Sequence, residues 1–391
     1  MKIINKMNFK ISNFFLNHKF KLVVSIIIFG IIGIVFIINN LCEYDLMPSS
    51  TGFCNYTIIT TNQENIIIEK ETFTRTLWDW FELLIFPIAL ALFAYYLNNY
   101  QKKMEHKIAE ERFNLERELR KDYERENLLR KFFDDINYLL TEKNLMSSPV
   151  DSTERSIARN KTLTTVRELD GVRKGKLFEF LFDSKLISIE NCIVDLSSAD
   201  FSNTVLNNYI FEKIVLKHVN FLGSNLNGIF IIDSNISISN FNKSNLENMS
   251  FSGSSINRCT FNKSNLSSTY FDGAKITNSY FNNSIMKYAT FSLAKIKRSK
   301  FIESDLHYGE FDGTEIYSSQ FDKSVFENSV FSQSNVCFSR FHSSNLKNAN
   351  FDFSNLSKID FTNAIMGDDW NRNCSTQMDI TLPDGQTIYQ Q

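Results

Sequence analysis

The sequence has few of the residues that define several protein classes. Six cysteines in 391 residues are too sparse for a disulfide scaffold, and 4 prolines with 13 glycines disfavour a collagen-like chain or a long disordered linker. The 42 Lys and Arg residues nearly balance the 44 Asp and Glu residues, which argues against a globally basic nucleic-acid binder and a strongly acidic chain alike. The sequence also lacks a phosphate-binding loop, a GxSxG motif and an HExxH motif. We therefore predict no enzyme activity, no catalytic residue, no metal site and no cofactor.

Two apolar stretches near the N-terminus predict a membrane anchor over residues 1–100. The first is an uncharged run of 17 residues, 22–38, which spans about 26 Å as a helix and extends to about residue 41. The second predicted span, 81–99, contains Pro87 and is flanked by aromatic residues typical of membrane interfaces. The alternatives are a cleaved signal peptide for the first stretch and a buried globular helix for the second.

The distribution of Lys and Arg predicts the orientation of this anchor. Five lysines precede the first span, and three lysines with Arg112 follow the second, whereas the predicted outer loop, 42–80, holds one Lys and one Arg. Basic flanks stay on the cytoplasmic side. We therefore expect an integral inner or plasma membrane protein with both termini in the cytoplasm. Cys42 and Cys54 share the outer loop and could form a disulfide if that compartment is oxidising.

Residues 101–146 predict a long charged helix, because they lack Gly and Pro and mix acids with bases. The helix is either a solvated spacer or a coiled coil that joins copies of the chain, and we expect a homo-oligomer formed through the spans and this helix. Arg112, Asp122 and Glu126 interrupt its heptad seam. The seam consists of Ile108, Leu115, Leu119, Leu129, Phe133, Ile136 and Leu140.

Residues 150–190 predict a helical cap. Ser152 or Thr153 can begin a helix over 154–170, which stops at Gly171. A second segment, 174–186, is rich in Leu and Phe and needs a partner surface.

An internal repeat begins at Leu196, from which every fifth residue up to Met366 is large and apolar. Neither a helix period of 3.6 nor a strand period of 2 produces this spacing. The positions from 201 to 361 in steps of 20 are all Phe, whereas the series beginning at Leu206 is Leu or Met apart from Phe326. The series beginning at Leu196 is rich in Ile, so the true period is 20 residues.

A period of 20 with four core positions predicts a four-sided coil, in which successive coils stack about 4.8 Å apart as strands do. Small residues two places before each core position predict a second inward site, and the Asn residues directly before many core positions suggest turns. Those asparagines are Asn225, Asn235, Asn245, Asn265, Asn335, Asn345 and Asn355. The histidines of this region, at 218, 307 and 342, fall on different columns.

The five-residue spacing over 196–366, within a predicted repeat domain of 191–366, resembles the pentapeptide-repeat family, and the segment 154–187 is similar to the region before the repeats in its membrane-anchored bacterial members. The resemblance implies a right-handed quadrilateral β-helix. The tail, 367–391, contains DITLPDGQTIY and predicts a capping hairpin about Asp384 and Gly385. The predicted fold is thus α plus β-solenoid: transmembrane helices, a long charged helix, and then the β-helix.

A basic cluster with two tyrosines is the candidate partner-binding surface. The alternative is a solvated, charge-balanced surface, because several acids follow within the next coil. Its residues are Lys275, Lys287, Lys295, Lys297, Arg298, Lys300, Tyr288 and Tyr308.

These features predict a non-enzymatic, membrane-anchored scaffold that presents a cytoplasmic β-helix to an unidentified protein partner. The alternative from another class is an oligomeric membrane channel or effector gated by the cytoplasmic part. A third possibility comes from the resemblance, since some family members mimic DNA and bind type II topoisomerases. With 14 acids and 15 bases over 196–366, the repeat region lacks the overall negative charge of such a mimic. Nucleic acid is not an expected partner.

Overall fold

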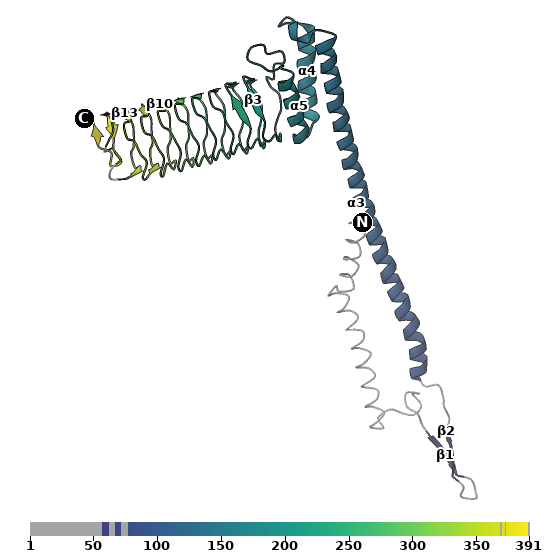
Figure 1. The fold of residues 1–391 in the computed structure, drawn as a ribbon. Helices are drawn as coiled ribbons and strands as arrows, with labels where there is room; N and C mark the ends of the chain where they lie inside the picture. Colours follow the sequence, from purple (N-terminus) through teal and green to yellow (C-terminus); the bar gives the residue numbers. More distant parts are fainter. Residues whose placement is uncertain (1–56, 62–66, 72–76, 368–369, 372, 390–391) are drawn as a thin grey trace. The chain divides into compact units, whose positions relative to one another are not determined.

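The computed structural model describes residues 57–61, 67–71, 77–367, 370–371 and 373–389 (Figure 1). The chain divides into two compact units, Met1–Leu115 and Glu116–Gln391, with the boundary inside helix α3. The predicted first span, 22–41, and the cysteines Cys42 and Cys54 lie outside the described residues.

The first unit contains a β-hairpin and the start of α3. Strand β1, Thr57–Thr61, pairs antiparallel with β2, Ile67–Glu71, inside the segment predicted to be an outer loop. Helix α3, Leu77–Thr141, is continuous and contains Pro87. The predicted second span, 81–99, falls in this helix, whose side chains are described at Leu83 and from Pro87 onward. In the part of the chain that the structure describes, no helix is long and apolar enough to cross a membrane.

The second unit begins with a helical cap made of the end of α3 and three further helices. These are the short 3-10 helix η2, Leu145–Ser147, helix α4, Thr153–Glu168, and helix α5, Gly171–Asp183. The hydroxyl of Ser152 caps α4 by accepting from the backbone N–H of Arg155, and the Asp170 carboxylate caps α5. The two predicted helical segments of the cap are therefore present, with slightly earlier starts.

The apolar seam at the end of α3 packs within the chain against the helical cap. Leu129, Phe132 and Ile136 are buried in the same core as the residues of α5. The ring of Phe133 lies 4.6 Å from that of Phe180. The acids that interrupt the heptads have a role in this packing, because Arg173 of α5 binds both of them. Its guanidinium lies 2.8 Å from Asp122 Oδ1 and 3.0 Å from Glu126 Oε2.

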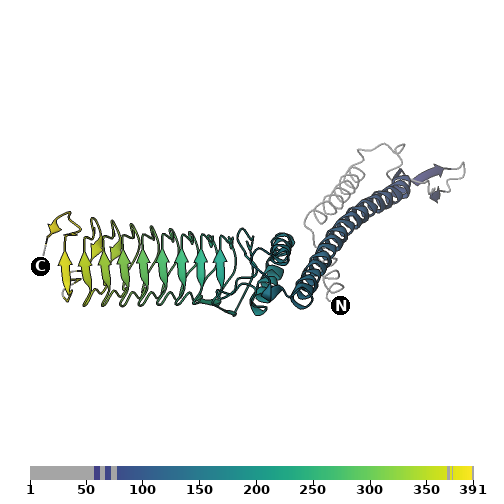
Figure 2. The same ribbon diagram turned by 90° about the horizontal axis from the view of Figure 1, so that it is seen from above.

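After the cap the chain winds into a parallel β-solenoid, which both ribbon views show as a row of stacked coils (Figures 1 and 2). Its largest sheet has nine strands in the order β4-β6-β7-β8-β9-β10-β11-β13-β15. These strands are Val215–Lys217, Asn235–Ser237, Ser255–Asn257, Lys275–Thr277, Lys295–Lys297, Glu315–Tyr317, Asn335–Cys337, Asn355–Ser357 and Thr376–Met378. Up to β13 each residue pairs with the residue 20 positions later, as the sequence predicted.

Three further ladders run beside this sheet, so that each coil has four sides. We name the sides by one coil: face A at 275–278, face B at 280–283, face C at 285–288 and face D at 290–293. Faces B, C and D are joined by strand pairs or isolated bridges such as Tyr280↔Lys300. Their regular strands are β3, Ile210–Glu212, with β5, Phe230–Ile232, on face D, and β12, Asn345–Leu346, with β14, Ile365–Met366, on face C.

Stacked phenylalanine rings fill the interior. The column that runs from Phe201 to Phe361 projects from face B, with ring centroids 4.6–5.5 Å apart. A second column projects from face D and meets the first edge to face, as between Phe241 and Phe251 at an interplanar angle of 82°. Because parallel strands lie about 4.8 Å apart, planar rings stack in contact at each coil.

The corners of the coil lie at a different position from the one predicted. Every fifth residue from Ser198 to Asn363 has a positive φ, which is the left-handed conformation that turns the chain onto the next side. These corner residues follow each core residue by two places. The asparagines that precede the core residues instead lie in the ladders, where Asn245 Nδ2 donates to Asn225 Oδ1 over 3.1 Å. They stabilise the stacking of coils rather than the turns.

Both ends of the solenoid are covered. At the N-terminal end Phe178 of α5 inserts its ring among Phe201, Phe211 and Phe221. At the other end β16, Ile380–Thr381, and β17, Thr387–Ile388, form the predicted hairpin. Covering the ends keeps the open sheet edges and the phenylalanine core from water.

Candidate interaction surface of the β-helix

The structure divides the predicted basic cluster between two places on the coil. Lys275, Lys295 and Lys297 lie on face A, where Lys275 and Lys295 are direct neighbours in β8 and β9. Arg298 occupies the corner between faces A and B and has a φ of 51°. Because Tyr288 and the following Tyr308 stand at the corner between faces C and D, two sides away, the eight residues do not form a single patch.

The face A group is only partly neutralised. Lys295 Nζ lies 2.8 Å from Glu315 Oε1 in the next coil. Lys275, Lys297 and Arg298 form no ion pair within the described residues. Lys300 begins face B, and its Nζ lies 6.0 Å from the centre of the Tyr280 ring. Lys275, Lys297 and Arg298 therefore extend from two adjacent coils without an ion-pair partner among the described residues.

Tyr288 and Tyr308 form an exposed stacked pair. Their ring centroids are 5.1 Å apart and the planes differ by 6°. Both have a positive φ, 59° and 58°, which is uncommon for a bulky residue. The ring of Tyr288 is 57% exposed. A broad aromatic surface held by rigid corners is the type of feature that dominates the energy of protein interfaces.

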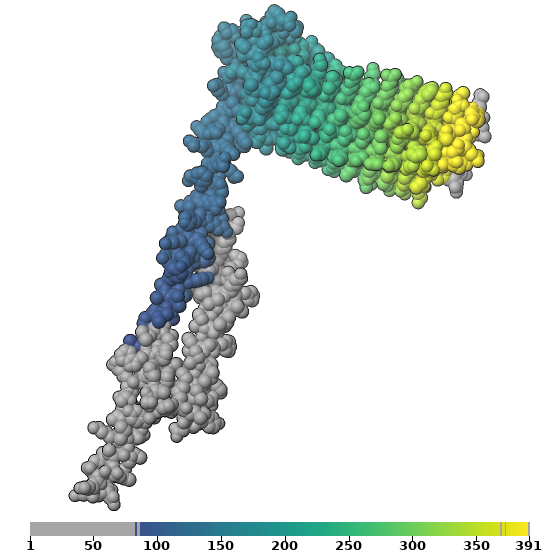
Figure 3. Space-filling model, turned by 180° about the vertical axis from the view of Figure 1, so that it is seen from behind, coloured from purple at the N-terminus to yellow at the C-terminus, as the bar shows by residue number. Residues whose placement is uncertain are grey.

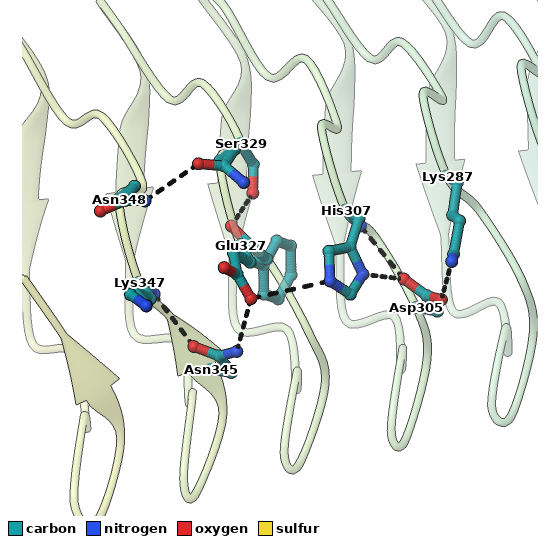
Figure 4. Close-up of polar contacts among 10 residues, drawn as sticks. Lys287, Asp305, His307, Glu327, Ser329, Asn345, Lys347 and Asn348 are labelled. Atoms are coloured by element: carbon teal, nitrogen blue, oxygen red, sulfur yellow. Dashed lines mark hydrogen bonds and ion pairs between the residues drawn. The ribbon is translucent and has the colours of Figure 1, made fainter.

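A polar network runs along face C through Lys287, Asp305, His307 and Glu327 (Figure 4). Lys287 Nζ lies 3.3 Å from Asp305 Oδ2, and the other oxygen of Asp305 pairs with Nδ1 of His307. On its far side His307 Nε2 lies 3.8 Å from Glu327 Oε2. Glu327 in turn accepts from Asn345 Nδ2 over 3.3 Å. The network spans four coils and places fixed charges along one edge of the tyrosine pair.

The charges around Asp305 affect its titration. Its partial burial acts to raise the pKa, but the hydrogen bonds from His307 and Lys287 and the charge of His307 outweigh that effect. The pKa of the Asp305 carboxyl is therefore lowered. Asp305 stays ionised and holds the imidazole and the Lys287 ammonium in place.

The charged residues are distributed unequally among the four faces, although the overall composition is balanced. Over residues 200–366, face A carries seven bases and one acid, whereas face D carries one base and six acids. The bases of face A are Lys217, Arg258, Lys275, Lys295, Lys297, Arg298 and Lys358, and the acids of face D are Glu212, Asp233, Asp272, Glu310, Asp312 and Asp352. The near balance of 14 acids and 15 bases over 196–366 thus holds only for the sum of the four faces. The space-filling view shows the even outer surface formed by the stacked coils (Figure 3).

The remaining histidines and cysteines are dispersed. His218 stands at a corner of face A, His307 on face C and His342 on face B, as their columns predicted. Cys259 is fully buried, and burial raises the pKa of its thiol to about 12. Desolvation also raises the pKa of the Cys337 thiol. Within the described ranges no three His, Cys, Asp or Glu side chains are grouped to hold a metal ion.

Two family models match the repeat region and a third matches the N-terminal segment. The model described as a pentapeptide repeat region matches residues 234–311, and the one described as pentapeptide repeats (8 copies) matches 195–229 and 324–368. The N-terminal segment, 7–85, matches the model of the Chlamydia CHLPS protein (DUF818). No curated protein matches.

The chain is also similar, at low TM-scores, to several solved structures. HetL, a pentapeptide repeat protein from the cyanobacterium Nostoc sp. strain PCC 7120, is 11% identical, with a TM-score of 0.33 over 54% of this chain and 98% of its own. Trypsin-treated QnrB1, a plasmid-mediated fluoroquinolone resistance protein, is 18% identical, with a TM-score of 0.29 over 45% and 91%. A thylakoid lumen protein of Arabidopsis thaliana is 23% identical, with a TM-score of 0.15 over 32% and 83%. The five-residue spacing, the four-sided coil and the two matching models agree that residues 195–368 are a region of pentapeptide repeats.

Proposed function

We propose that this protein is a membrane-anchored, non-enzymatic scaffold whose β-helix binds a cytoplasmic protein partner. The observation that carries the proposal is the exposed Tyr288–Tyr308 stack with the charged network of Lys287, Asp305 and His307 beside it. A rigid aromatic centre with a polar rim is the usual anatomy of a protein-binding patch. We name these five residues the tyrosine patch.

The composition and exposure of α3 support the membrane part of the proposal. Its residues from Leu83 to Tyr100 contain no charged side chain. Leu90 and Leu92 are 53% and 63% exposed, and Ile88 and Phe93 are also exposed. Such a continuous apolar surface is unfavourable in water. Together with the uncharged run at 22–38, it supports two helices that place both termini on the cytoplasmic side.

Extraction and labelling test the anchor and its orientation. We expect the full-length chain to remain in the membrane pellet after washing with alkaline carbonate. In a background with the native cysteines changed to serine, Thr61→Cys should react with an impermeant maleimide from outside. Lys347→Cys, in the β-helix, should react only after the membrane is permeabilised. Release by carbonate, or labelling of both positions from the same side, would refute the anchor or its orientation.

Site-specific photocrosslinking tests the tyrosine patch. A photoreactive phenylalanine at position 288 should crosslink to one defined cellular protein, and the same amino acid at Tyr270 should not. Tyr270 is a matched control because it is an exposed tyrosine on face D. Tyr308→Ala should abolish the crosslink at 288, since it removes half of the aromatic surface. Identical products at 288 and 270, or no product at 288, would contradict the assignment.

We also propose that the chain self-associates through its spans and through the first part of the charged helix. The seam residues Leu129, Phe133 and Ile136 pack inside the chain and are not available to a second copy. Leu115 and Leu119 are exposed and remain available for association. We expect Leu119→Glu to weaken any oligomer formed by the helix, as measured by the mass of the detergent-solubilised protein.

A further inference from the structure

Faces A and D have opposite charge and are adjacent sides of the same rod. Face D ends and face A begins at one column of corner residues. That column consists of Lys213, Asp233, Gly253, Gly273, Leu293, Gly313, Gln333 and Phe353. Three of its eight members are glycine, whereas each of the other corners has at most one. The column is small at its glycines but also carries exposed apolar side chains, because Leu293 and Phe353 are 71% and 64% exposed.

Most charges of both faces lack an ion-pair partner among the described residues. None of the six acids of face D forms an ion pair with a described residue, and on face A only Lys295 does so, with Glu315. Glu310 and Asp312 follow Lys295, Lys297 and Arg298 by less than one coil. The densest acidic group and the densest basic group therefore lie at similar positions along the rod axis. Like charges that stack at the strand spacing of about 4.8 Å repel one another and favour a partner of opposite sign.

We infer that the β-helix associates with further copies of itself, the basic face A of one copy packing against the acidic face D of the next. A second copy satisfies both faces at once. A nucleic acid or an anionic lipid surface would neutralise face A and leave face D unpaired. In parallel rods the two flat faces present the same strand spacing, so opposite charges remain aligned along the whole contact.

The geometry of the coil fixes how many copies close the assembly. Each side has five residues and ends at an equivalent left-handed corner, so the cross-section is a square. When face A of one square rod meets face D of the next, each copy is rotated by a quarter turn. A contact between different faces generates a ring when the rotation closes. Four copies therefore close a ring, with this corner column and its exposed Leu293 and Phe353 side chains along the axis.

Charge reversal in the full-length, detergent-solubilised protein tests this arrangement. The face A variant carries Lys295→Glu and Lys297→Glu, and the face D variant carries Glu310→Lys and Asp312→Lys. The control on face B carries Lys243→Glu and Lys263→Glu, with the same change in net charge as the face A variant. All six side chains are on the outer surface, so the fold should persist, and circular dichroism verifies this.

The variants have distinct expected results. The parent chain and the face B control should show a defined four-copy mass at low salt that dissociates at high salt, because contacts between exposed charges are screened. Each variant alone should lose at least tenfold in association. An equimolar mixture of the two should recover the oligomer, since one then has two acidic faces and the other two basic faces. The chain with all four substitutions should associate with itself.

A carbodiimide crosslink provides a second measurement that does not depend on the helix or the membrane spans. In a mixture of labelled and unlabelled chains, we expect products between chains that join Lys295 or Lys297 to Glu310 or Asp312. The inference is overturned if the charge reversals leave the mass unchanged, if the mixture fails to recover association, or if crosslinks between chains avoid these pairs. Binding of face A to duplex DNA or to anionic vesicles more tightly than to a second copy would also overturn it. The test needs no membrane and no cellular partner, so its outcome is separate from that of the proposed function.

Discussion

The rings of Phe261 and Phe281 lie parallel, with centroids 4.7 Å apart and an interplanar angle of 2°. The two residues are 20 positions apart, so one complete coil of chain separates two groups in direct contact. The stack repeats along both phenylalanine columns, and its spacing matches that of neighbouring strands. The core therefore holds the coils together in the same direction as the backbone hydrogen bonds.

Interrupting this stack should be costly. Phe281→Ala removes a fully buried ring in contact with rings above and below, and we expect it to lower the free energy of unfolding by about 3–5 kcal/mol. Phe326→Leu is the control, because it restores the residue usual in its column and should cost less than about 1.5 kcal/mol. Urea denaturation followed by circular dichroism measures both. Equal losses would show that the stacked columns have no special role.

The left-handed corners predict a stabilising substitution. Ile238 has a φ of 54°, which is strained for a β-branched residue, whereas Asn278, two coils further along the same corner column, has a φ of 52° and suits that conformation. We expect Ile238→Asn to raise the free energy of unfolding by about 0.5–1 kcal/mol, and Asn278→Ile to lower it by about 1–2 kcal/mol. Thermal denaturation of the two variants provides the comparison. Changes of the same sign would contradict the corner argument.

The contact between α5 and the first coil predicts the sign of a glycine substitution. A Cβ at Gly175 would lie 2.4 Å from the carbonyl oxygen of Val205, so the helix could not keep its position. Gly→Ala inside a helix is otherwise stabilising by about 1 kcal/mol. We expect Gly175→Ala to destabilise the chain by about 1–3 kcal/mol through overpacking. Lys176→Ala, on the exposed side of α5, is the control, and a more stable Gly175→Ala chain would disprove the close packing.

The network on face C predicts a pH-dependent contribution to stability. The pKa of Asp305 is lowered in the folded chain from its ordinary value of 3.8, so its stabilisation is complete above that value and is lost as the pH falls through the folded pKa. Asp305→Asn should be less stable than the parent by up to about 1 kcal/mol at neutral pH. We expect this difference to narrow below pH 3.8 in denaturation curves measured across the acid range. A difference that stays constant with pH would argue against ionisation of Asp305 as its source.

Thiol reactivity should follow burial. Cys259 is fully buried with a pKa raised to about 12, so it should resist alkylation at neutral pH until the chain unfolds. Cys337 is only partly buried and should react slowly in the native state. Mass spectrometry of peptides after pulsed alkylation distinguishes the two sites. Fast native labelling of Cys259 would mean that the β-helix opens locally.

The sequence predicted the β-helix because its core is strictly periodic. A large apolar residue at every fifth position fixes the register of the whole rod, and Phe201 and Phe361 are accordingly both buried. The corner position was mispredicted because the Asn residues before the core are common turn formers. Only the backbone angles show that residues such as Ile238 and Tyr288 make the turns.

The candidate site was only partly predictable, and for a different reason. The bases at 275–300 are close in the sequence, but the chain makes a corner after every five residues, so Lys287 and Lys297 face opposite ways. The packing of Phe133 and Ile136 inside the cap was also missed, because a heptad pattern does not distinguish a second chain from a helix of the same chain. Arg173, which pairs with the two acids of that seam, stands outside any repeat and gave no signal in the sequence.

Because a corner follows every fifth residue, the number of residues in the β-helix determines toward which side each later residue points. Loss or gain of 20 residues would change the number of coils and leave each column continuing into the same side. A change of five residues before β9 would turn everything downstream by a quarter, so the lysines of β9 would continue an uncharged or acidic column instead of the column of Lys275. Insertions and deletions are therefore compatible with the surfaces of this rod only in whole turns, even where the phenylalanine core would accept a shorter step.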